Sequence, residues 1–426
     1  MTTFIVLAPL VLVGHLGWWV FCYNRINSTA IPRRIIKFME LAIVALAVGI
    51  PLAFTLLYWP ALQSLARGES TGNLPPLLLV WGAWSLGCVA VLGPGWLESR
   101  LWLWPPRNML AQQVERLNVA DHVTGPITGK WLSNSLRKLP LNEITHLSVT
   151  QKAIQLEREF PRRWESLTIG HLSDLHFTGE LTPAFYHHVI ERMQALSPDL
   201  IAITGDIVDK DACIDWIEPI LGRLSAPLGC YFLFGNHERR LSCVEPVAER
   251  LRGLGWCDVG VQDVTVDPGG SAPHMPGRPR MILCGNERPW FERHVGDHWQ
   301  AGPLADAQAD TALKIALAHT PDQHPWAREL GMDLMLAGHT HGGQVRIPCI
   351  GPLIAPSRYG SRFASGVFRL PPTIMHVSRG LSGTQPLRWR CPPEISLLTI
   401  LPSHAEGDTT FAQSRSEPSA AVLHLD

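Results

Sequence analysis

The first hundred residues of the chain contain three long stretches that carry no Lys, Arg, Asp or Glu. They cover Phe4–Tyr23, Leu41–Ala66 and Ser70–Leu97. Each stretch can supply the roughly 20 apolar residues that a helix needs to cross about 30 Å of hydrocarbon. Buried core helices of a large soluble domain are the alternative, but three such runs joined by short polar links favour membrane spans. We therefore predict that residues 1–100 form a transmembrane region of about three helices.

The rest of the chain has the charge density of an ordinary soluble domain. Residues 1–100 carry six Lys/Arg and three Asp/Glu, so 64 of the 73 charged side chains lie in the other 326 residues. The net charge of −1 excludes the global basic field that is typical of nucleic-acid-binding proteins, and we expect no such partner. The nine cysteines form no CxxC pair and no zinc-finger spacing, so a disulfide framework is not expected.

Basic residues near the predicted spans indicate their orientation. They are concentrated in the link between the first two stretches (Arg25, Arg33, Arg34 and Lys37) and after the third (Arg100, Arg107 and Arg116). Only Arg67 separates the second stretch from the third. By the positive-inside rule, the amino terminus lies outside and everything after about residue 100 lies in the cytoplasm. We expect a multi-pass protein of the cell inner membrane.

The chain after the spans divides into three parts. Residues 101–164 are interpreted as a juxtamembrane connecting region, with a helix expected over Met109–Leu117 and a strand over Leu147–Leu156. Its excess of positive charge suits contact with anionic headgroups, and a solvated linker is the alternative. Residues 165–402 are expected to form the main domain, and the polar segment 403–426 a disordered tail.

From Leu167 onward, short apolar strands alternate with helical segments, and polar side chains follow one strand after another. The strands with this property are predicted at Leu167–Leu172, Asp199–Thr204, Cys230–Phe234, Leu313–Ala318 and Asp333–Ala337. Alternating strands and helices indicate an α/β layer arrangement. In open α/β sheets, ligands bind at the carboxyl ends of the strands, so we expect the polar residues to gather there.

The residues that follow these strands are carboxylates, imidazoles and an amide, without a thiolate. They are Asp174, His176, Asp206, Asn236, His319, His339 and His341. Such donors suit hard or borderline divalent ions. Two ions bridged by one carboxylate, about 3.5–4 Å apart, suit in-line displacement at phosphorus. Each motif alone is weak evidence. A lone Asp-x-His usually consists of ordinary polar residues of the surface or core, and Asp209 can be a helix cap or a group that orients a ligand.

The ordered set of motifs resembles the calcineurin-like metallophosphoesterase superfamily. The motifs are Asp174-x-His176, Gly205-Asp206-x-x-Asp209, Gly235-Asn236-His237-Glu238, His319 and Gly338-His339-x-His341. The run Gly338–Gln344 and the later Ser378-Arg379-Gly380-Leu381 resemble a membrane-associated bacterial subgroup of UDP-2,3-diacylglucosamine pyrophosphatase-like enzymes and related phosphodiesterases. The resemblance implies an α/β fold, a calcineurin-like layered β-sandwich flanked by helices, here preceded by the α-helical transmembrane region. Glu238 departs from the Asp of many relatives.

The resemblance also implies roles for these residues. One divalent metal ion would be held by Asp174, His176, Asp206 and His341, and a second by Asp206, Asn236, His319 and His339. A metal-bridged hydroxide would attack phosphorus, and His237 would donate a proton to the leaving oxygen or stabilise the transition state. The same oxygen and nitrogen donors accept Mn, Fe, Zn or Co, so the metal is not identified.

The substrate is expected to be a phosphodiester or pyrophosphate, with a lipid-linked molecule as the leading hypothesis. The loop Ile347–Phe368 is apolar with basic and aromatic insertions, and Arg346, Arg358 and Tyr359 are candidate substrate-binding residues. Packing of this loop against the sheet is the alternative. A different class of function, a membrane scaffold or sensor with a vestigial phosphoesterase fold, would be indicated by a missing metal donor, and none is missing.

Overall fold

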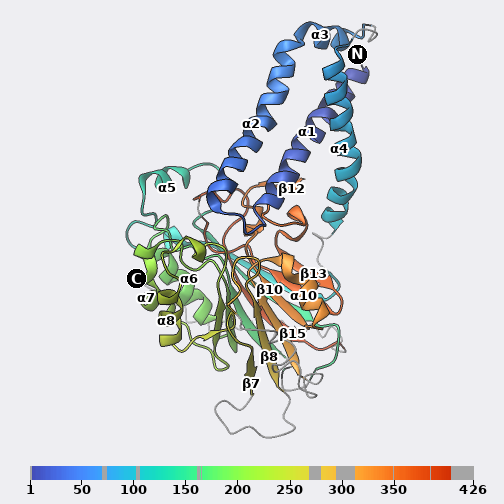
Figure 1. Cartoon of the computed structure of the whole chain (residues 1–426). Coiled ribbons are helices and arrows are strands. Elements are labelled where there is room, and N and C mark those ends of the chain that lie inside the picture. Colours follow the sequence, from blue (N-terminus) through green and yellow to red (C-terminus); the bar gives the residue numbers. More distant parts are fainter. Residues whose placement is uncertain are drawn as a thin grey trace, which may run out of the picture.

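Three long helices extend from one end of a domain built on two β-sheets (Figure 1). The computed structural model describes residues 2–69, 74–101, 106–160, 164, 166–267, 280–293, 312–348, 350–383 and 385–403. The predicted tail, 403–426, lies outside the described residues except for Ser403.

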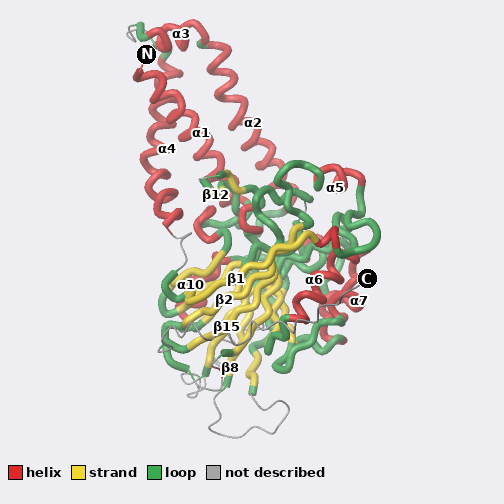
Figure 2. The backbone as a smooth tube through the Cα atoms, turned by 180° about the vertical axis from the view of Figure 1, so that it is seen from behind, coloured by secondary structure: helices red, strands yellow, loops and turns green. Residues whose placement is uncertain are grey.

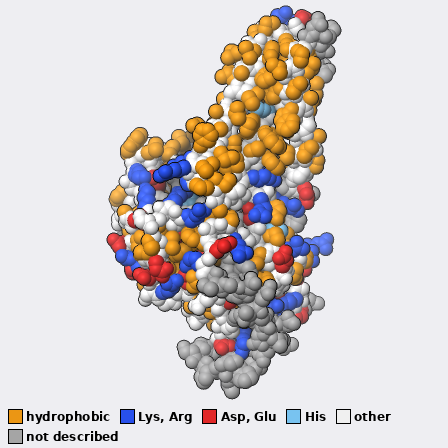
Figure 3. Space-filling view, viewed as in Figure 1, with side chains coloured by type: hydrophobic (Ala, Val, Ile, Leu, Met, Phe, Trp, Pro, Cys, Tyr) orange, Lys and Arg blue, Asp and Glu red, His pale blue; other side chains and the backbone are white. Residues whose placement is uncertain are grey.

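The amino-terminal region consists of α1 (Thr2–Ile26), α2 (Arg33–Leu57), the short α3 (Trp59–Arg67) and α4 (Pro76–Leu101). Three segments, Ile5–Ile26, Arg33–Leu57 and Pro76–Arg100, are long and apolar enough to cross a membrane. The prediction of three apolar spans is thus confirmed. The helices expose many apolar side chains to their surroundings, as a lipid-facing surface requires (Figure 3).

The second predicted stretch contains two helices rather than one. The chain breaks at Tyr58, and α3 begins there with a proline in its first turn and ends at Gly68 in the left-handed conformation. The link between α1 and α2 and the carboxyl end of α4 lie next to the domain, whereas α3 lies at the far end (Figure 1). The links rich in basic residues are therefore at the domain end of the helices.

Direct hydrogen bonds fasten the helices to the domain. Asn24 of α1 donates to the Leu353 carbonyl at 3.0 Å and accepts from the Ala355 N–H at 2.9 Å. Arg100 of α4 donates to the Pro352 carbonyl at 3.1 Å. The ends of α1 and α4 thus rest on the same loop, the one predicted to be apolar.

The domain contains a seven-stranded and a six-stranded sheet. The larger has the order β1-β2-β15-β3-β4-β5-β6, with β1 (Met109–Asn118), β2 (His146–Gln155), β3 (Leu167–Leu172), β4 (Leu200–Thr204), β5 (Cys230–Leu233), β6 (Cys257–Asp258) and β15 (Glu394–Leu401). The smaller has the order β13-β14-β10-β9-β8-β7, with β7 (Val264–Val266), β8 (Met281–Asn286), β9 (Leu313–Ala318), β10 (Leu334–Ala337), β13 (Gly366–Leu370) and β14 (Thr373–Val377). A hairpin joins β11 (Arg346–Ile347) and β12 (Gly351–Pro352).

The two sheets pack face to face, and helices cover their outer faces (Figure 2). Alternate residues, such as Ile169 of β3 and both Ile315 and Leu317 of β9, fill the core between the sheets. The outer face of the larger sheet packs against α6 (Pro183–Ala195), α7 (Ile217–Leu221) and α8 (Glu245–Gly253). The outer face of the smaller sheet packs against α10 (His324–Glu329). The expected α/β sandwich flanked by helices is confirmed.

The region 101–164, expected to be a connection, also supplies two strands. The helix expected over Met109–Leu117 is wrong, because this segment is β1 and pairs antiparallel with β2. In turn, β2 pairs parallel with β15, and β15 pairs antiparallel with β3. Pairing with a distant strand has therefore overridden a local sequence that favours a helix.

Candidate metal centre

The polar residues that follow the predicted strands come together at one edge of the sandwich. Strands β3, β4 and β5 run parallel in one sheet, and β9 and β10 run parallel in the other. Parallel strands bring their carboxyl ends to the same edge. Two of the donor groups that form there contain Asp206: Asp174, His176, Asp206 and His341, and Asp206, His319 and His339. The donor atoms within each group lie within 4.8 Å of one another, and Asp206 belongs to both.

The first group contains four buried or nearly buried side chains. His176 Nε2 lies 3.2 Å from His341 Nε2 and 3.6 Å from Asp206 Oδ2. His341 Nε2 lies 3.5 Å from Asp174 Oδ1. Imidazole and carboxylate donors at these separations can hold one divalent ion.

The second group shares the carboxylate of Asp206 and includes the predicted amide donor. His319 Nε2 lies 3.2 Å from Asp206 Oδ2, 3.2 Å from His339 Nδ1 and 3.1 Å from Asn236 Oδ1. The structure therefore brings all seven predicted donors into two adjoining groups.

The hydrogen bonds behind the imidazoles fix which ring nitrogen is directed at the centre. His319 Nδ1 donates to the Thr204 carbonyl at 2.7 Å, and His341 Nδ1 lies 3.1 Å from the Ser382 carbonyl. His176 Nδ1 lies 2.7 Å from the Asp209 carboxylate. Because carbonyls and carboxylates only accept, Nδ1 of His319 and of His176 carries a proton, and Nε2 is the nitrogen left to bind a cation once it has lost its own proton. Nε2 atoms that converge in this way fit a cation.

The carboxylate shared by the two groups supports the same conclusion. Asp206 Oδ2 is buried and accepts no well-directed hydrogen bond from any described residue. Burial would raise the pKa of Asp206, but His237 and His319 outweigh it and hold that pKa well below its usual range. Burial would likewise lower the pKa of His319, yet Asp206 and Asp174 raise it to about 9. Positive charge is thus favoured at this point, and a divalent metal ion can supply it.

The backbone at the donors is strained. Of the ten described non-glycine residues with positive φ, five are predicted donors: Asp174, His176, Asp206, His339 and His341, with φ between 48° and 69°. Such conformations cost of order 1–3 kcal/mol each and concentrate at functional sites. Sharp turns directly after the strands aim these side chains inward.

Two glycines let the donor loops approach one another. Gly205 has φ +85°, and a Cβ there would lie 2.7 Å from His319 Nδ1. A Cβ on Gly338 would lie 1.8 Å from Ser173 Oγ and 2.5 Å from Asp174 Oδ2. Any side chain at either position would push a donor out of place.

The predicted catalytic residue, His237, lies beside both groups. Its Nε2 is 3.9 Å from Asp206 Oδ2, and its Nδ1 is 2.6 Å from Asp209 Oδ2. Arg240 donates to His237 Nε2 at 2.8 Å and to Asp209 Oδ2 at 2.8 Å. Burial lowers the pKa of His237 to about 4, so the imidazole is neutral at neutral pH. Asp209 therefore orients both His176 and His237, which is more than a helix cap does.

Glu238, the departure from the superfamily motif, ties two donor loops together. Its carboxylate accepts the backbone N–H groups of Asp206 at 3.2 Å, Ile207 at 2.5 Å, Val208 at 3.1 Å and Gly235 at 2.8 Å. Burial and the charge of Asp206 raise the pKa of Glu238 to about 7. The longer side chain therefore has a structural role at the centre.

Arg388 also supports the centre, and no motif in the sequence indicates it. Arg388 is fully buried and donates to the carbonyls of His341, Arg379 and Ser382. It therefore fixes the loop of His341 from behind. Its role depends on contacts between segments about 50 residues apart, which a local pattern does not reveal.

Trp290 forms a second contact that sequence reasoning did not identify. Its ring centroid lies 4.7 Å from that of His339 and 5.4 Å from that of His319. Its indole N–H donates to the Thr29 carbonyl in the α1–α2 link at 3.3 Å. Arg239 donates to the next carbonyl, that of Ala30, at 3.1 Å. The donor groups thus lie on the side of the domain that faces the membrane helices.

The three candidate substrate-binding residues lie in two places. Arg346 donates to the Gly342 carbonyl at 3.0 Å and also contacts Ser365, so it is next to the loop of His341. Arg358 and Tyr359 lie at a different corner: Arg358 is 3.8 Å from Asp322, and the Tyr359 ring packs against His324. Their role in substrate binding stays a prediction.

Comparison with known proteins agrees with the motifs. Residues 167–343 match the family model described as calcineurin-like phosphoesterase. The uncharacterized metallophosphoesterase YkuE of Bacillus subtilis is 29% identical over 248 residues, which cover 56% of this chain and 81% of that protein. Phosphodiesterase YaeI of Escherichia coli is 28% identical over 236 residues (54% and 80%). UDP-2,3-diacylglucosamine pyrophosphatase LpxG of Chlamydia trachomatis is 26% identical over 298 residues (60% and 89%).

Proposed function

We propose that the protein is a membrane-anchored hydrolase that cleaves phosphodiester or pyrophosphate bonds with two divalent metal ions. Residues 167–343 match the family model described as calcineurin-like phosphoesterase, which supports this reaction class. The observation that carries the proposal is the pair of donor groups that share the Asp206 carboxylate. When bound, two such ions supply Lewis acidity and activate water for attack at phosphorus.

The chain's own residues have distinct tasks in this proposal. The seven donors hold the ions, and Asp209 keeps His176 and His237 in the tautomers that their positions require. Arg240 places a guanidinium next to His237, where it can bind an oxygen of the phosphoryl group or of the leaving group. Because His237 is neutral and accepts from Arg240, stabilisation of the transition state by this pair fits better than proton donation by His237 alone.

The position of the centre supports a lipid-linked substrate. Trp290 packs against His339 and His319 and also donates to the Thr29 carbonyl of the α1–α2 link, so it connects the centre to the end of the predicted spans. A phosphate attached to a lipid is held near the bilayer surface, which is where this link emerges from the predicted spans. The substrate named for the Chlamydia relative, UDP-2,3-diacylglucosamine, has this chemistry.

The test compares substrates on the full chain in detergent and in lipid nanodiscs with Mn²⁺. We expect hydrolysis of UDP-2,3-diacylglucosamine or of a diacyl phosphodiester with a higher kcat/KM than that of bis(p-nitrophenyl) phosphate, and loss of all activity in Asp206→Asn. Faster turnover of the soluble diester that is indifferent to lipid would refute the lipid-linked substrate. Binding of less than one metal equivalent, with no hydrolysis, would instead favour the scaffold or sensor.

We also propose that the catalytic domain lies in the cytoplasm, on the inner membrane. Arg25, Arg33, Arg34, Lys37 and Arg100 are at the domain end of the helices, and the positive-inside rule assigns that end to the cytoplasm. A reporter that is active only in the cytoplasm should therefore be active when it is fused after residue 403. Activity restricted to an extracytoplasmic reporter at the same position would reverse the orientation.

A further inference from the structure

Four large apolar side chains on and just after α5 (Trp131–Leu136) are exposed on the surface of the domain. The residues are Trp131, Leu132, Leu139 and Leu141, with exposed fractions of 79, 48, 47 and 53%. We call these four side chains the α5 patch. Exposed apolar groups that cluster in a short segment indicate a site of contact with a protein or a membrane.

The α5 patch lies at the membrane end of the domain. In Figures 1 and 2, which differ by a half-turn about the vertical axis, α5 is at the height at which α2 begins, to one side of the helices. In Figure 3, apolar side chains gather on this side of the domain as well as along the helices. A bilayer crossed by α1, α2 and α4 would therefore have its near surface at the level of α5.

The patch is accompanied by basic residues. Lys138 is exposed after α5 and Arg137 is half-buried at its end, whereas the exposed Lys130 before α5 is paired with Glu180. An outward-facing Trp with neighbouring leucines and lysines is typical of segments that lie in the interface of a bilayer containing anionic lipids. The positive charge next to the patch therefore favours the surface of a bilayer that contains anionic lipids.

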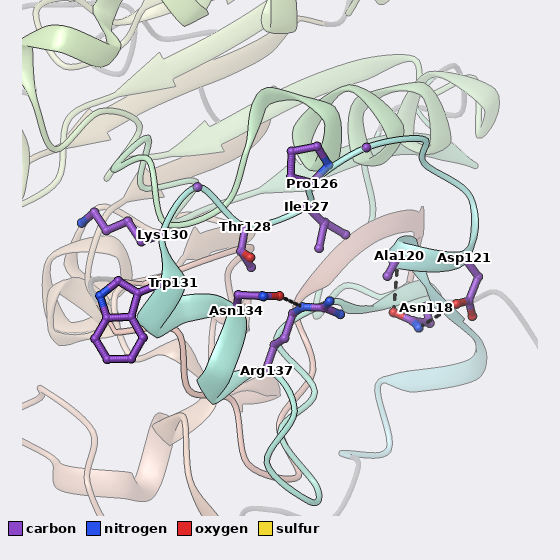
Figure 4. Close-up of a pocket in the computed structure, with 12 residues that line it drawn as sticks. Asn118, Ala120, Asp121, Pro126, Ile127, Thr128, Lys130, Trp131, Asn134 and Arg137 are labelled. Carbon is purple, nitrogen blue, oxygen red and sulfur yellow. Dashed lines mark hydrogen bonds between the residues drawn. The ribbon is translucent and has the colours of Figure 1, made fainter.

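The side chains of the α5 patch do not pack into the interior of the domain. A hollow of about 690 Å³ lies behind α5, lined by residues that include Asn118, Thr128, Asn134 and Arg137 (Figure 4). Trp131 is at its edge, and Figure 4 shows the indole projecting away from the other side chains of the lining. The indole therefore points outward although a space lies behind it.

The segment is fastened to the domain close to the metal centre. Lys130 and Ser133 both bind the carboxylate of Glu180, four residues after the donor His176. Asn142 donates to the Leu136 carbonyl at 2.8 Å and to the Pro386 carbonyl at 3.0 Å. Contact of α5 with a surface would therefore fix the orientation of the centre relative to that surface.

We propose that the α5 patch inserts into the headgroup region of the bilayer that the helices cross, as a second membrane contact that holds the metal centre toward the lipid surface. The occupant is the membrane itself, because the patch is at the level of the helix ends and carries adjacent lysines. The proposal depends on the membrane spans and not on which phosphoester is cleaved.

The first experiment places an environment-sensitive fluorophore (NBD) on the patch. The full chain carries Leu132→Cys, with its other reactive cysteines replaced by serine, in nanodiscs of phosphatidylcholine and phosphatidylglycerol. The matched control carries Glu249→Cys on α8, an exposed position away from the helices. We expect blue-shifted emission at position 132 that brominated acyl chains quench, and water-like, unquenched emission at position 249.

Two results would overturn the proposal. Water-like emission at position 132 would show that the patch stays in solvent. Blue-shifted emission without quenching by brominated lipids would show that a protein, such as a second copy of the chain, covers it instead.

A second variant separates docking from folding. Trp131→Ser should reduce the quenching of a fluorophore at Leu139→Cys severalfold, while hydrolysis of bis(p-nitrophenyl) phosphate stays at the level of the parent chain. Unchanged quenching would contradict the proposal. If no phosphoester is hydrolysed at all, the proposed function fails, but the quenching data still decide whether the patch docks.

Discussion

Asp209 offers the sharpest test of how the centre is organised. One carboxylate oxygen lies 2.7 Å from His176 Nδ1, and the other lies 2.6 Å from His237 Nδ1 and 2.8 Å from Arg240. In Asp209→Asn, the amide oxygen can accept from only one of these imidazoles. The amide NH₂ would face the Nδ1 of the other, and that ring would have to move its proton to Nε2, the atom directed at the centre.

The expected magnitude follows from this geometry. Loss of a group that orients a metal-bound histidine typically costs 10- to 100-fold in metal affinity or activity, which is about 1.4–2.8 kcal/mol. We expect the Mn²⁺ affinity of Asp209→Asn to fall by about this factor through His176. In addition, kcat at saturating Mn²⁺ should fall about tenfold or more, because His237 and Arg240 also lose their partner.

The assay is calorimetric titration with Mn²⁺, followed by kinetics with bis(p-nitrophenyl) phosphate. Asp211→Asn is the matched control, because Asp211 lies on the same loop but binds Ser242 at the surface, at 2.8 and 3.0 Å. It should behave like the parent chain. An Asp209→Asn protein with unchanged Mn²⁺ affinity and unchanged kcat would refute the claim that this carboxylate sets the tautomers.

Two further predictions concern charge in the core and at the centre. Glu394→Gln should destabilise the fold by about 3–5 kcal/mol, because it leaves Lys152 and Arg379 without their buried partner. Chemical denaturation measures this, and Glu157→Gln, which weakens an ion pair with the exposed Arg369, should cost less than about 1 kcal/mol; equal losses would contradict the argument. In the metal-free protein, the raised pKa of His319 gives stability that is fully present below about pH 6.5 and is lost as the pH rises through about 9. Because a metal ion must displace that proton, Mn²⁺ affinity should rise about tenfold per pH unit across this window, and a flat profile in the titration would count against it.

The strands that carry the donors were predictable because their signal is local. The segments Leu167–Leu172 and Leu313–Ala318 are strands with the predicted bounds, and the other three strands differ by one residue each. Each combines an apolar run with an immediate turn, so short-range preference and burial agree. Because each donor motif follows a strand and parallel strands end at the same edge of a sheet, the donors could be predicted to lie at one edge.

What the sequence did not reveal depends on pairings between distant segments. Met109–Leu117 has residues that favour a helix, but β2 is available as a partner only because β15, some 240 residues later, extends the sheet. Arg388 and Trp290 reach the centre from segments without a motif of their own. Their contacts follow from the tertiary arrangement, which no window of sequence contains.

The strain at the donors has to be held by contacts from the surrounding structure. Five donors have left-handed backbone conformations, and several buried carboxylates and imidazoles converge on one point. Such an arrangement is unfavourable unless the rest of the fold determines it. Glu238 provides four backbone hydrogen bonds, and Arg388 binds three carbonyls, so the loops cannot relax separately. A bound cation removes the remaining repulsion, and metal should therefore stabilise this protein as well as activate it.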